Sequence, residues 1–93
     1  MDKVETAEIL KQELLHYRKR SQADLLYLLD NQDTFDRIGP SGTVYQLEIQ
    51  AYWDDESRRE LRVTACIDDG GWSAFYPPGD SFIMRPDGSF VGE

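Results

Sequence analysis

The sequence predicts an α+β fold, with one or two N-terminal helices packed on one face of a four- to five-stranded antiparallel meander sheet. In the first third of the chain, apolar residues recur every three or four positions, as on one side of a helix. From Thr43 onward they alternate with polar residues, as in strands with one buried face. We assign residues 1–93 to a single domain that is helical over 3–30, a connection over 31–42 and a sheet over 43–92.

Apolar side chains near the N-terminus define the face of the first helix. Basic residues then follow Tyr17, which is typical of a helix C-terminus, and Ser21 resembles a new N-cap. We therefore prefer two helices, the second from about residue 21 to 30; one long kinked helix is the alternative, because a continuous stripe through 14–28 also fits. The stripe expected to face the sheet is Val4, Ala7, Leu10, Leu14 and Tyr17, widened by Ile9 and Leu15.

The connection ends in residues that favour a tight turn. Phe35 and Ile38 either anchor this segment or form a short edge strand. The stretch 39–42 reads Gly-Pro-Ser-Gly, in which proline fixes one dihedral angle and glycine accepts a positive one. We therefore expect the sheet to begin just after this turn.

Two alternating segments, 45–53 and 61–67, predict the central pair of strands. Their apolar residues all have odd numbers, and two residues paired across antiparallel strands point to the same face of the sheet. Both apolar sets therefore share one face only if odd residues pair with odd ones, so that the numbers of each pair have an even sum. A five-residue loop between them places Ala51 opposite Leu61. A slip by one residue would turn charged side chains into the core, so we expect the facing of these side chains to be well specified.

Further turns divide the rest of the chain. A third strand is expected over Trp72–Tyr76, ended by a turn at Pro77–Asp80, and the next strand over Phe82–Arg85. The stretch Arg85–Gly88 is typical of a type I turn closed by a glycine bulge, after which Ser89–Val91 returns as a strand.

Acidic residues gather at the expected corners of the sheet. The acids at 54–56 and the pair Asp68 and Asp69 lie at opposite ends of a hairpin, roughly 25 Å apart at the usual rise of a strand. Asp80 is expected near the first end and Asp87 near the second. A calcium ion shared by Asp68, Asp69 and Asp87 is the minor alternative, but we interpret these residues as ordinary turn aspartates and predict no metal or cofactor.

The chain offers few groups for catalysis. His16 is its one histidine and Cys66 its one cysteine, too few for a four-ligand zinc site. A Cys66–His16 pair would need the helix on the sheet face that carries Cys66, and the pattern places it on the other. Ser41 does not fit a nucleophile elbow, and phosphate-binding loops are absent from the sequence. These observations predict a non-enzymatic protein.

The charge distribution favours one class of partner. The formal net charge is −8, and residues 1–20 carry five basic groups against four acids, so the acidity belongs to residues 21–93. Such a body repels nucleic acid and anionic membranes and suits a basic protein partner; the alternative is that acidity only maintains solubility. The run Arg18–Arg20 is interpreted as a solvated helix end.

The sequence also bears on cellular location. It is polar from its first residues, and its longest apolar run, Leu25–Leu29, is far shorter than the ~20 residues that cross a bilayer. A single cysteine forms no intrachain disulfide. We therefore expect a cytoplasmic protein, either a monomer or a dimer paired through a sheet edge.

Five blocks of sequence suggest a resemblance over roughly residues 20–93. In their order, the chain resembles a group of short, uncharacterised bacterial α+β proteins. The resemblance implies a bacterial context and neither an activity nor a site. The blocks are 39–43 (GPSGT), 45–50 (YQLEIQ), 53–55 (WDD), 68–72 (DDGGW) and 87–93 (DGSFVGE).

The expected function is protein binding, for example as an inhibitor or immunity-type partner. Exposed aromatic side chains ringed by acids are typical of binding surfaces, although cross-strand packing of the aromatics is the alternative. The rival hypothesis is small-molecule or divalent-metal binding, or hydrolysis, in a helix–sheet pocket near Tyr17, Trp53 and the acids at 54–56. The candidate binding surface is Tyr52, Asp54, Asp55, Glu56, Trp72 and Tyr76.

Overall fold

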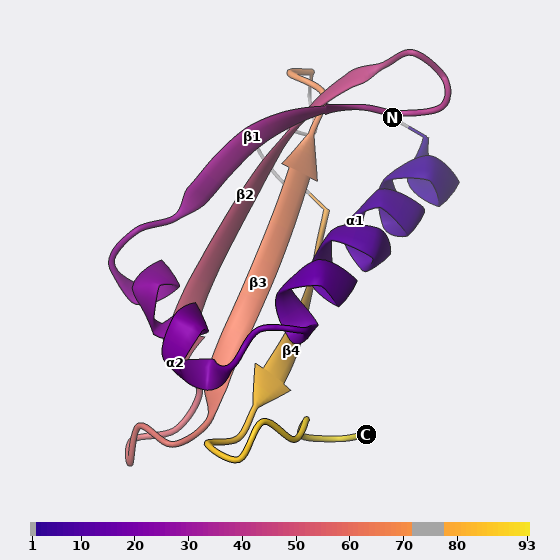
Figure 1. The fold of residues 1–93 in the computed structure, drawn as a ribbon. Helices are drawn as coiled ribbons and strands as arrows, with labels where there is room; N and C mark the ends of the chain where they lie inside the picture. Colours follow the sequence, from indigo (N-terminus) through magenta and orange to yellow (C-terminus); the bar gives the residue numbers. More distant parts are fainter. Residues whose placement is uncertain (1, 72–77) are drawn as a thin grey trace.

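A computed structural model describes residues 2–71 and 78–93 of the chain. The four strands form one antiparallel sheet in the order β1-β2-β3-β4, and the helices lie on one side of it (Figure 1). This confirms the predicted α+β meander; the strand expected over residues 72–76 lies outside the described residues. The elements are α1 (Lys3–Arg18), α2 (Gln22–Leu25), the 3-10 turn η1 (Leu26–Leu29), β1 (Asp33–Ile38), β2 (Val44–Trp53), β3 (Leu61–Asp68) and β4 (Gly79–Met84).

Side-chain caps divide the N-terminal region into two helices. The Asp2 carboxylate accepts hydrogen bonds from the N–H groups of Val4 and Glu5, both at 3.0 Å, and begins α1. The Ser21 hydroxyl accepts one from the N–H of Asp24 at 3.1 Å and begins α2. The preference for two helices over one kinked helix is therefore confirmed. Within the described residues, none of the helices is both long and apolar enough to cross a membrane.

The buried face of α1 differs from the predicted stripe. Val4 is 82% exposed and Leu15 48% exposed, and Ala7 is also exposed, so the prediction was wrong for these three residues. At its N-terminal end α1 turns Thr6 and Ile9 inward in place of Val4 and Ala7, and Leu15 lies outside the buried face. The buried hydroxyl of Thr6 is satisfied, because it donates to the Asp2 carbonyl at 3.0 Å. The buried residues of α1 are Thr6, Ile9, Leu10, Leu14 and Tyr17.

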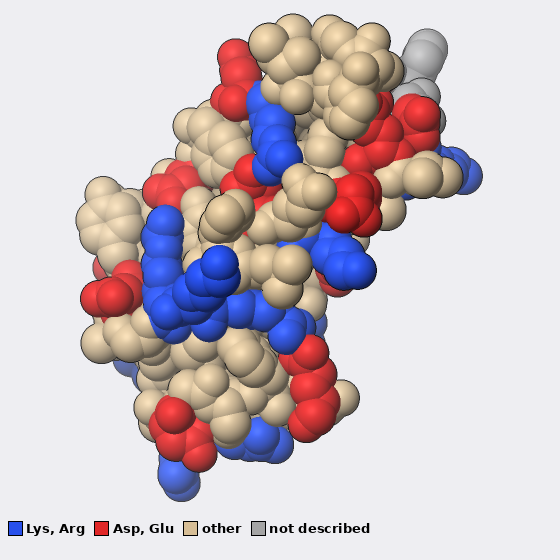
Figure 2. Space-filling view, turned by 45° about the vertical axis from the view of Figure 1, so that its right-hand side comes forward, with Lys and Arg blue, Asp and Glu red and all other residues tan. Residues whose placement is uncertain are grey.

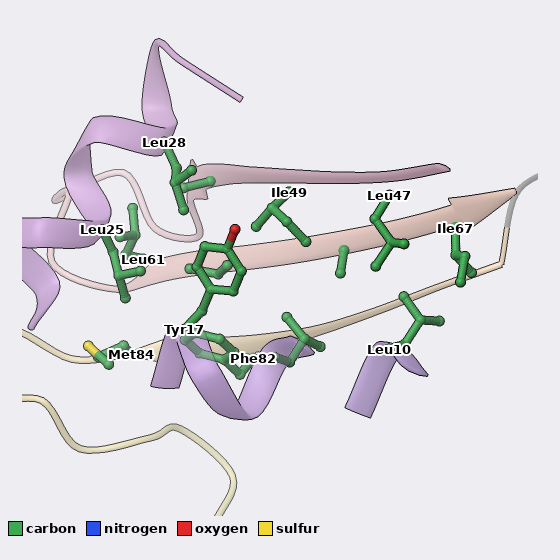
Figure 3. Packing of buried hydrophobic residues seen from close by; sticks show 14 of the residues in the cluster. Leu10, Tyr17, Leu25, Leu28, Leu47, Ile49, Leu61, Ile67, Phe82 and Met84 are labelled. Carbon is green, nitrogen blue, oxygen red and sulfur yellow. The ribbon is translucent and has the colours of Figure 1, made fainter. Parts of the chain in front are cut away.

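The core lies between the helices and the inner face of the sheet (Figure 3). The odd-numbered residues from 45 to 51 in β2 and from 61 to 67 in β3 point inward and are buried, as the alternation predicted. Phe82 and Met84 of β4 join them from the next strand. From the helical layer, the core receives Ile9, Leu10, Leu14, Tyr17, Leu25 and Leu28.

The register of β2 against β3 is shifted by two residues from the prediction. Ala51 pairs with Val63, not with Leu61, which pairs with Trp53. The loop from Asp54 to Glu60 is longer than the five residues assumed, and its N–H and C=O ends meet where Asp54 N–H donates to Glu60 O at 2.8 Å. Because the shift is an even number, each side chain still points to its predicted face.

Strand β1 is the edge strand that the sequence left as one of two alternatives. Its Phe35 packs partly buried against the core, whereas Ile38 is 70% exposed. The β1–β2 turn closes as predicted, since Gly42 N–H donates to Gly39 O at 2.9 Å and Gly42 has a φ of +87°. The connection therefore contains a strand of the sheet.

Strand β4 begins earlier than predicted. The sequence placed a turn at Pro77–Asp80, but Gly79 pairs with Cys66 and Asp80 pairs with Ala65, inside the strand. A Cβ at Gly79 would lie 2.9 Å from the Ala65 carbonyl oxygen, so this glycine serves a close approach of two backbones and not a turn.

The chain after β4 turns back along the same strand. Gly88 N–H donates to Arg85 O at 2.9 Å, and the φ of Gly88 is +87°, which confirms the predicted turn with its glycine bulge. The expected returning strand is reduced to a bridge between Met84 and Phe90, with Val91 N–H donating to Ile83 O at 2.9 Å. This segment covers part of the free edge of β4.

Candidate functional site

The predicted binding surface is only partly gathered in the structure. Tyr52 is 50% exposed on the face of the sheet turned away from the helices, and Asp54 and Glu56 are exposed in the loop beyond it. Tyr52 pairs across the strands with Arg62, whose Nε donates to Asp54 at 2.8 Å, so these three side chains are neighbours. Trp72 and Tyr76, also predicted for this surface, lie outside the described residues.

Asp55 has a structural role within the same loop. Its carboxylate accepts hydrogen bonds from the N–H groups of Arg59 at 3.0 Å and Glu60 at 2.9 Å, and from the Ser57 hydroxyl. The Ser57 bond, followed by the backbone bonds, lowers the pKa of Asp55. Asp55 therefore holds the loop in shape, while Asp54 pairs with Arg62 and Glu56 is exposed.

The face turned away from the helices is a mixed, acidic surface, which we call the outer face. Three of its acids are Asp36, Glu48 and Asp68, and its described cation, Arg62, is paired with Asp54. It also carries the exposed side chains of Ile38, Val44 and Tyr52. Its side chains are Thr34, Asp36, Ile38, Val44, Gln46, Glu48, Gln50, Tyr52, Arg62, Thr64, Cys66, Asp68, Ser81 and Ile83.

The acidic corners lie apart, as predicted for 54–56 and 68–69, which flank opposite ends of β3. The predicted positions of Asp80 and Asp87 were reversed, however. Because β4 pairs directly with β3, Asp80 lies opposite Ala65 and Asp87 follows the pairing of Met84 with Leu61; the prediction had placed another strand between them. In the part of the chain that the structure describes, three or more metal-ligating side chains are nowhere gathered. Asp87 is therefore too distant to share a calcium ion with Asp68 and Asp69.

The turn after β3 confirms the structural interpretation of its aspartates. Asp68 accepts a hydrogen bond from Gly70 N–H and Asp69 accepts one from Gly71 N–H, both at 3.0 Å. Gly70 has a φ of +84°, which a residue with a side chain adopts at a cost in free energy. These residues form the corner that follows the strand.

Cys66 and His16 lie on opposite sides of the sheet. Cys66 is half-buried on the outer face, where burial raises the pKa of its thiol and the charge of Glu48 raises it further. His16 is exposed on α1, which packs on the inner face. A raised pKa disfavours the thiolate, which is the nucleophilic form of cysteine.

Of the helix–sheet pocket expected near Tyr17, Trp53 and the acids at 54–56, the part near Tyr17 and Trp53 is occupied by core side chains, while a cavity of about 330 Å³ lies beside Asp55, lined by residues of the 54–60 loop with Arg85 and Pro86. Tyr17 is buried in the core, and its hydroxyl donates to Asp33 at 2.6 Å. Burial, followed by the hydrogen bond to Asp33, raises the pKa of Tyr17. Leu25 and Leu61 occupy the neighbouring space (Figure 3), and Trp53 packs against the same core.

A cavity of about 420 Å³ lies elsewhere, between the first turns of α1 and the β1–β2 hairpin. We call it the groove. Its lining includes the exposed side chain of Val4 and the charged groups of Glu8 and Arg37, and it also touches Ile38, whose side chain belongs to the outer face. Figure 2 shows acidic side chains gathered at this end of the molecule, around the start of α1. The sequence reasoning missed the groove, because it assigned Val4 to the buried stripe.

Glu5 fastens α1 to the hairpin beside the groove. Its carboxylate accepts hydrogen bonds from the Tyr45 hydroxyl at 2.6 Å, the Ser41 hydroxyl at 2.7 Å and the Ser41 N–H at 2.8 Å. The Tyr45 bond, and then the Ser41 bonds, lower the pKa of Glu5, and the same Tyr45–Glu5 bond raises the pKa of Tyr45. A Cβ at Gly39 would lie 2.5 Å from a Glu5 carboxylate oxygen and 3.0 Å from the Tyr45 ring, so a side chain there would displace the Glu5 carboxylate.

Comparisons with known proteins identified no relative of this chain. The chain matches no protein-family model, no curated protein and no solved structure. The resemblance to short bacterial proteins therefore stays a prediction.

The basic end of α1 is engaged more closely than a solvated helix end. The Arg18 guanidinium lies 4.5 Å from the centre of the Phe90 ring and 5.3 Å from that of Phe82, and it pairs with Glu93 at 2.7 Å. Arg20 lies 4.4 Å from the Tyr17 ring centre. Figure 2 shows Lys and Arg side chains in a band across the middle of this side of the molecule.

Proposed function

We propose that the chain is a non-enzymatic protein-binding domain whose outer face engages a basic partner, for example as an inhibitor or immunity-type protein. The observation that carries this proposal is the composition of the outer face. Asp36, Glu48 and Asp68 stand among three exposed large apolar side chains, on the side of the sheet that the helices leave uncovered (Figure 1). Apolar groups with a charged surround are typical of protein interfaces.

The distribution of charge supports a basic partner. Three of the arginines are paired within the chain, Arg18 with Glu93, Arg37 with Glu13 and Arg62 with Asp54. With a net charge of −8, many acids are therefore left to act on molecules outside. Such a field raises the association rate of a cationic protein and suppresses binding of anionic ones.

Two observations support a non-enzymatic role. The Cys66 thiol is held toward its protonated form, and His16 lies across the sheet from it. The interior near Tyr17 and Trp53 is packed with side chains, which leaves substrate little room there. Binding through a surface requires neither an activated nucleophile nor a deep cleft.

The experiment is affinity capture from a bacterial lysate with a matched pair of double variants. The test variant is Glu48→Gln with Tyr52→Ser on the outer face, and the control is Asp24→Asn with Tyr27→Ser on the helical side. Each pair removes one acid and one exposed aromatic ring. We expect the wild type and the control to retain the same basic protein, in larger amounts at low salt, and the test variant to lose it.

Two results would contradict the proposal. Equal retention by both variants would show that the outer face is not the binding surface. A rise in the melting temperature with a divalent metal or a small molecule, together with no specific capture at low or physiological salt, would favour the rival ligand-binding function.

A further inference from the structure

Strand β1 offers backbone hydrogen-bonding groups along a free edge. Gly39 N–H donates to Thr43 O at 2.9 Å, and in an antiparallel pair hydrogen-bonded positions alternate. The backbone groups of Asp33, Phe35 and Arg37 therefore face β2. Those of residues 34, 36 and 38 point away from the sheet, and no described residue pairs with them. Such an edge is a template for another strand.

The groove lies directly beside this edge. Arg37 extends from β1 toward α1, where its guanidinium donates to Gln12 at 2.7 Å and also contacts Glu13. This contact forms part of the groove lining, and the exposed side chain of Val4 contributes apolar surface. A strand added to β1 would direct every second side chain to the inner side of the sheet, toward the groove, and the remaining side chains to the outer face.

The charge of the groove selects the side chains that it accepts. Three acids line it, Asp2, Glu5 and Glu8, against the single cation of Arg37, which is already engaged by α1. Asp36 is a further exposed acid of the edge strand, but its side chain lies on the outer face and not in the groove. Lysine or arginine side chains that enter the groove would meet carboxylates, and their aliphatic stems would contact Val4.

We propose that β1 accepts an extended segment of a partner protein as a fifth strand, with basic side chains directed into the groove and the alternate side chains extending the outer face. This inference rests on the proposed function, since the occupant belongs to the same basic partner. A second copy of this chain is a poorer occupant. It brings the same net charge of −8, and symmetric pairing centred on Asp36 would place two Asp36 carboxylates side by side.

The test uses a defined probe, a blocked fluorescent peptide of alternating lysine and valine. Two further peptides carry backbone N-methyl groups, either on every valine or on every lysine, which removes hydrogen-bond donors from one edge of the strand without changing charge. If lysines enter the groove, valine N–H groups face β1. We therefore expect N-methylation of valine to abolish binding and N-methylation of lysine to be tolerated, as measured by fluorescence anisotropy.

A variant of the chain tests the same edge from the other side. Asp36→Pro removes an N–H that points away from the sheet, so its pairing with β2 is kept. Asp36→Asn removes the charge and keeps the N–H, and it is the matched control. We expect about tenfold weaker peptide binding for Asp36→Pro and a smaller loss for Asp36→Asn. Circular dichroism checks that each variant is folded, and the methylated peptides give the same answer if Asp36→Pro is not.

The outcomes separate this inference from the proposed function. Binding that is insensitive to both methylations, or blocked by lysine methylation alone, would overturn the assignment of basic side chains to the groove. The same holds if the wild type dimerises, Asp36→Pro is monomeric and the peptide does not bind, since a second copy then occupies the edge. If lysate capture is lost in the Glu48→Gln, Tyr52→Ser variant but kept in Asp36→Pro, the outer face is the binding surface and strand addition is wrong.

Discussion

The two ends of α1 are fastened to the sheet by different chemistry. Toward the C-terminus, Leu14 and Tyr17 enter the core and Arg18 covers the rings of Phe82 and Phe90. Toward the N-terminus, Val4 is exposed, and the Glu5 carboxylate makes the contact through hydrogen bonds to Tyr45 and Ser41. One end is held mainly by buried apolar surface and the other by polar groups near the solvent.

This difference explains where the groove lies. At the C-terminal end of α1, apolar packing leaves a smaller cavity, of about 260 Å³, lined in part by Leu14, Leu15 and Arg18. At the N-terminal end, a carboxylate reaches across to the hairpin, and a cavity remains beside the contact. Binding and stability are thus assigned to opposite ends of one helix, and substitutions at the two ends test that division.

The largest expected effect is at the apolar end. Leu14→Ala removes a buried side chain from the core and should lower the free energy of unfolding by about 2–5 kcal/mol. The matched control is Leu15→Ala at the neighbouring, half-exposed position, which should change it by about 0.5 kcal/mol or less. Urea denaturation measures both, and similar losses would contradict the assigned face of α1.

A smaller effect is expected at the polar end. In Gly39→Ala, the added methyl group would collide with the Glu5 carboxylate and approach the Tyr45 ring at 3.0 Å, which should lower the free energy of unfolding by about 1–3 kcal/mol. In a Glu5→Ala background, Gly39→Ala should lower the free energy of unfolding by less, because the Glu5 carboxylate is gone and only the Tyr45 ring remains close to the added methyl group. An equal cost in both backgrounds would show that the Glu5 contact does not govern this position.

The cation at the apolar end should contribute less again. Arg18→Met keeps much of the aliphatic stem but removes the guanidinium from the Phe82 and Phe90 rings, at an expected cost of about 0.5–1 kcal/mol. Lys19→Met, at the next and exposed position, is the control and should leave stability nearly unchanged. If both variants behave alike, the ring contacts do not stabilise the helix end.

The smallest effect is the pH dependence of the Glu5–Tyr45 hydrogen bond. The pKa of Glu5 is lowered in the folded protein, so its contribution is complete above the ordinary value of 4.5 and is lost as pH falls through the folded value. The pKa of Tyr45 is raised, so its contribution is complete below the ordinary value of 10.0 and is lost as pH rises through the folded value.

Tyr45→Phe should therefore be less stable than the wild type by a constant amount near neutral pH. This difference should shrink in acid and in strong alkali, as measured by thermal unfolding across the pH range. A difference of the same size at acidic, neutral and alkaline pH would contradict the hydrogen bond as its source.

Features that depend on local sequence could be predicted. The alternation of apolar and polar residues predicted which residues of β2 and β3 face inward, and the glycines predicted the turns at Gly42 and Gly88. Each of these patterns is determined within a few residues. The register of β2 against β3 is shifted from the prediction by two residues, an even number. Each side chain therefore still points to the predicted face of the sheet.

Features that depend on tertiary packing could not be predicted from the sequence. The rotation of α1 depends on which of two overlapping stripes meets the sheet, so Val4 and Leu15 were placed wrongly. The end of the sheet at which Asp80 or Asp87 lies depends on whether β4 pairs directly with β3 or another strand comes between them. The one signal for the groove was Glu5, an acid beside the buried side of the helix, together with Gly39 across from it.

The position of Cys66 has a practical consequence. It is the single thiol of the chain, and it is accessible in part on the outer face, close to Glu48. A spin label or fluorophore attached there under mildly alkaline conditions would sit inside the proposed contact area and leave the helical layer untouched. Its signal would report directly whether, and how fast, a bound molecule shields that surface from water.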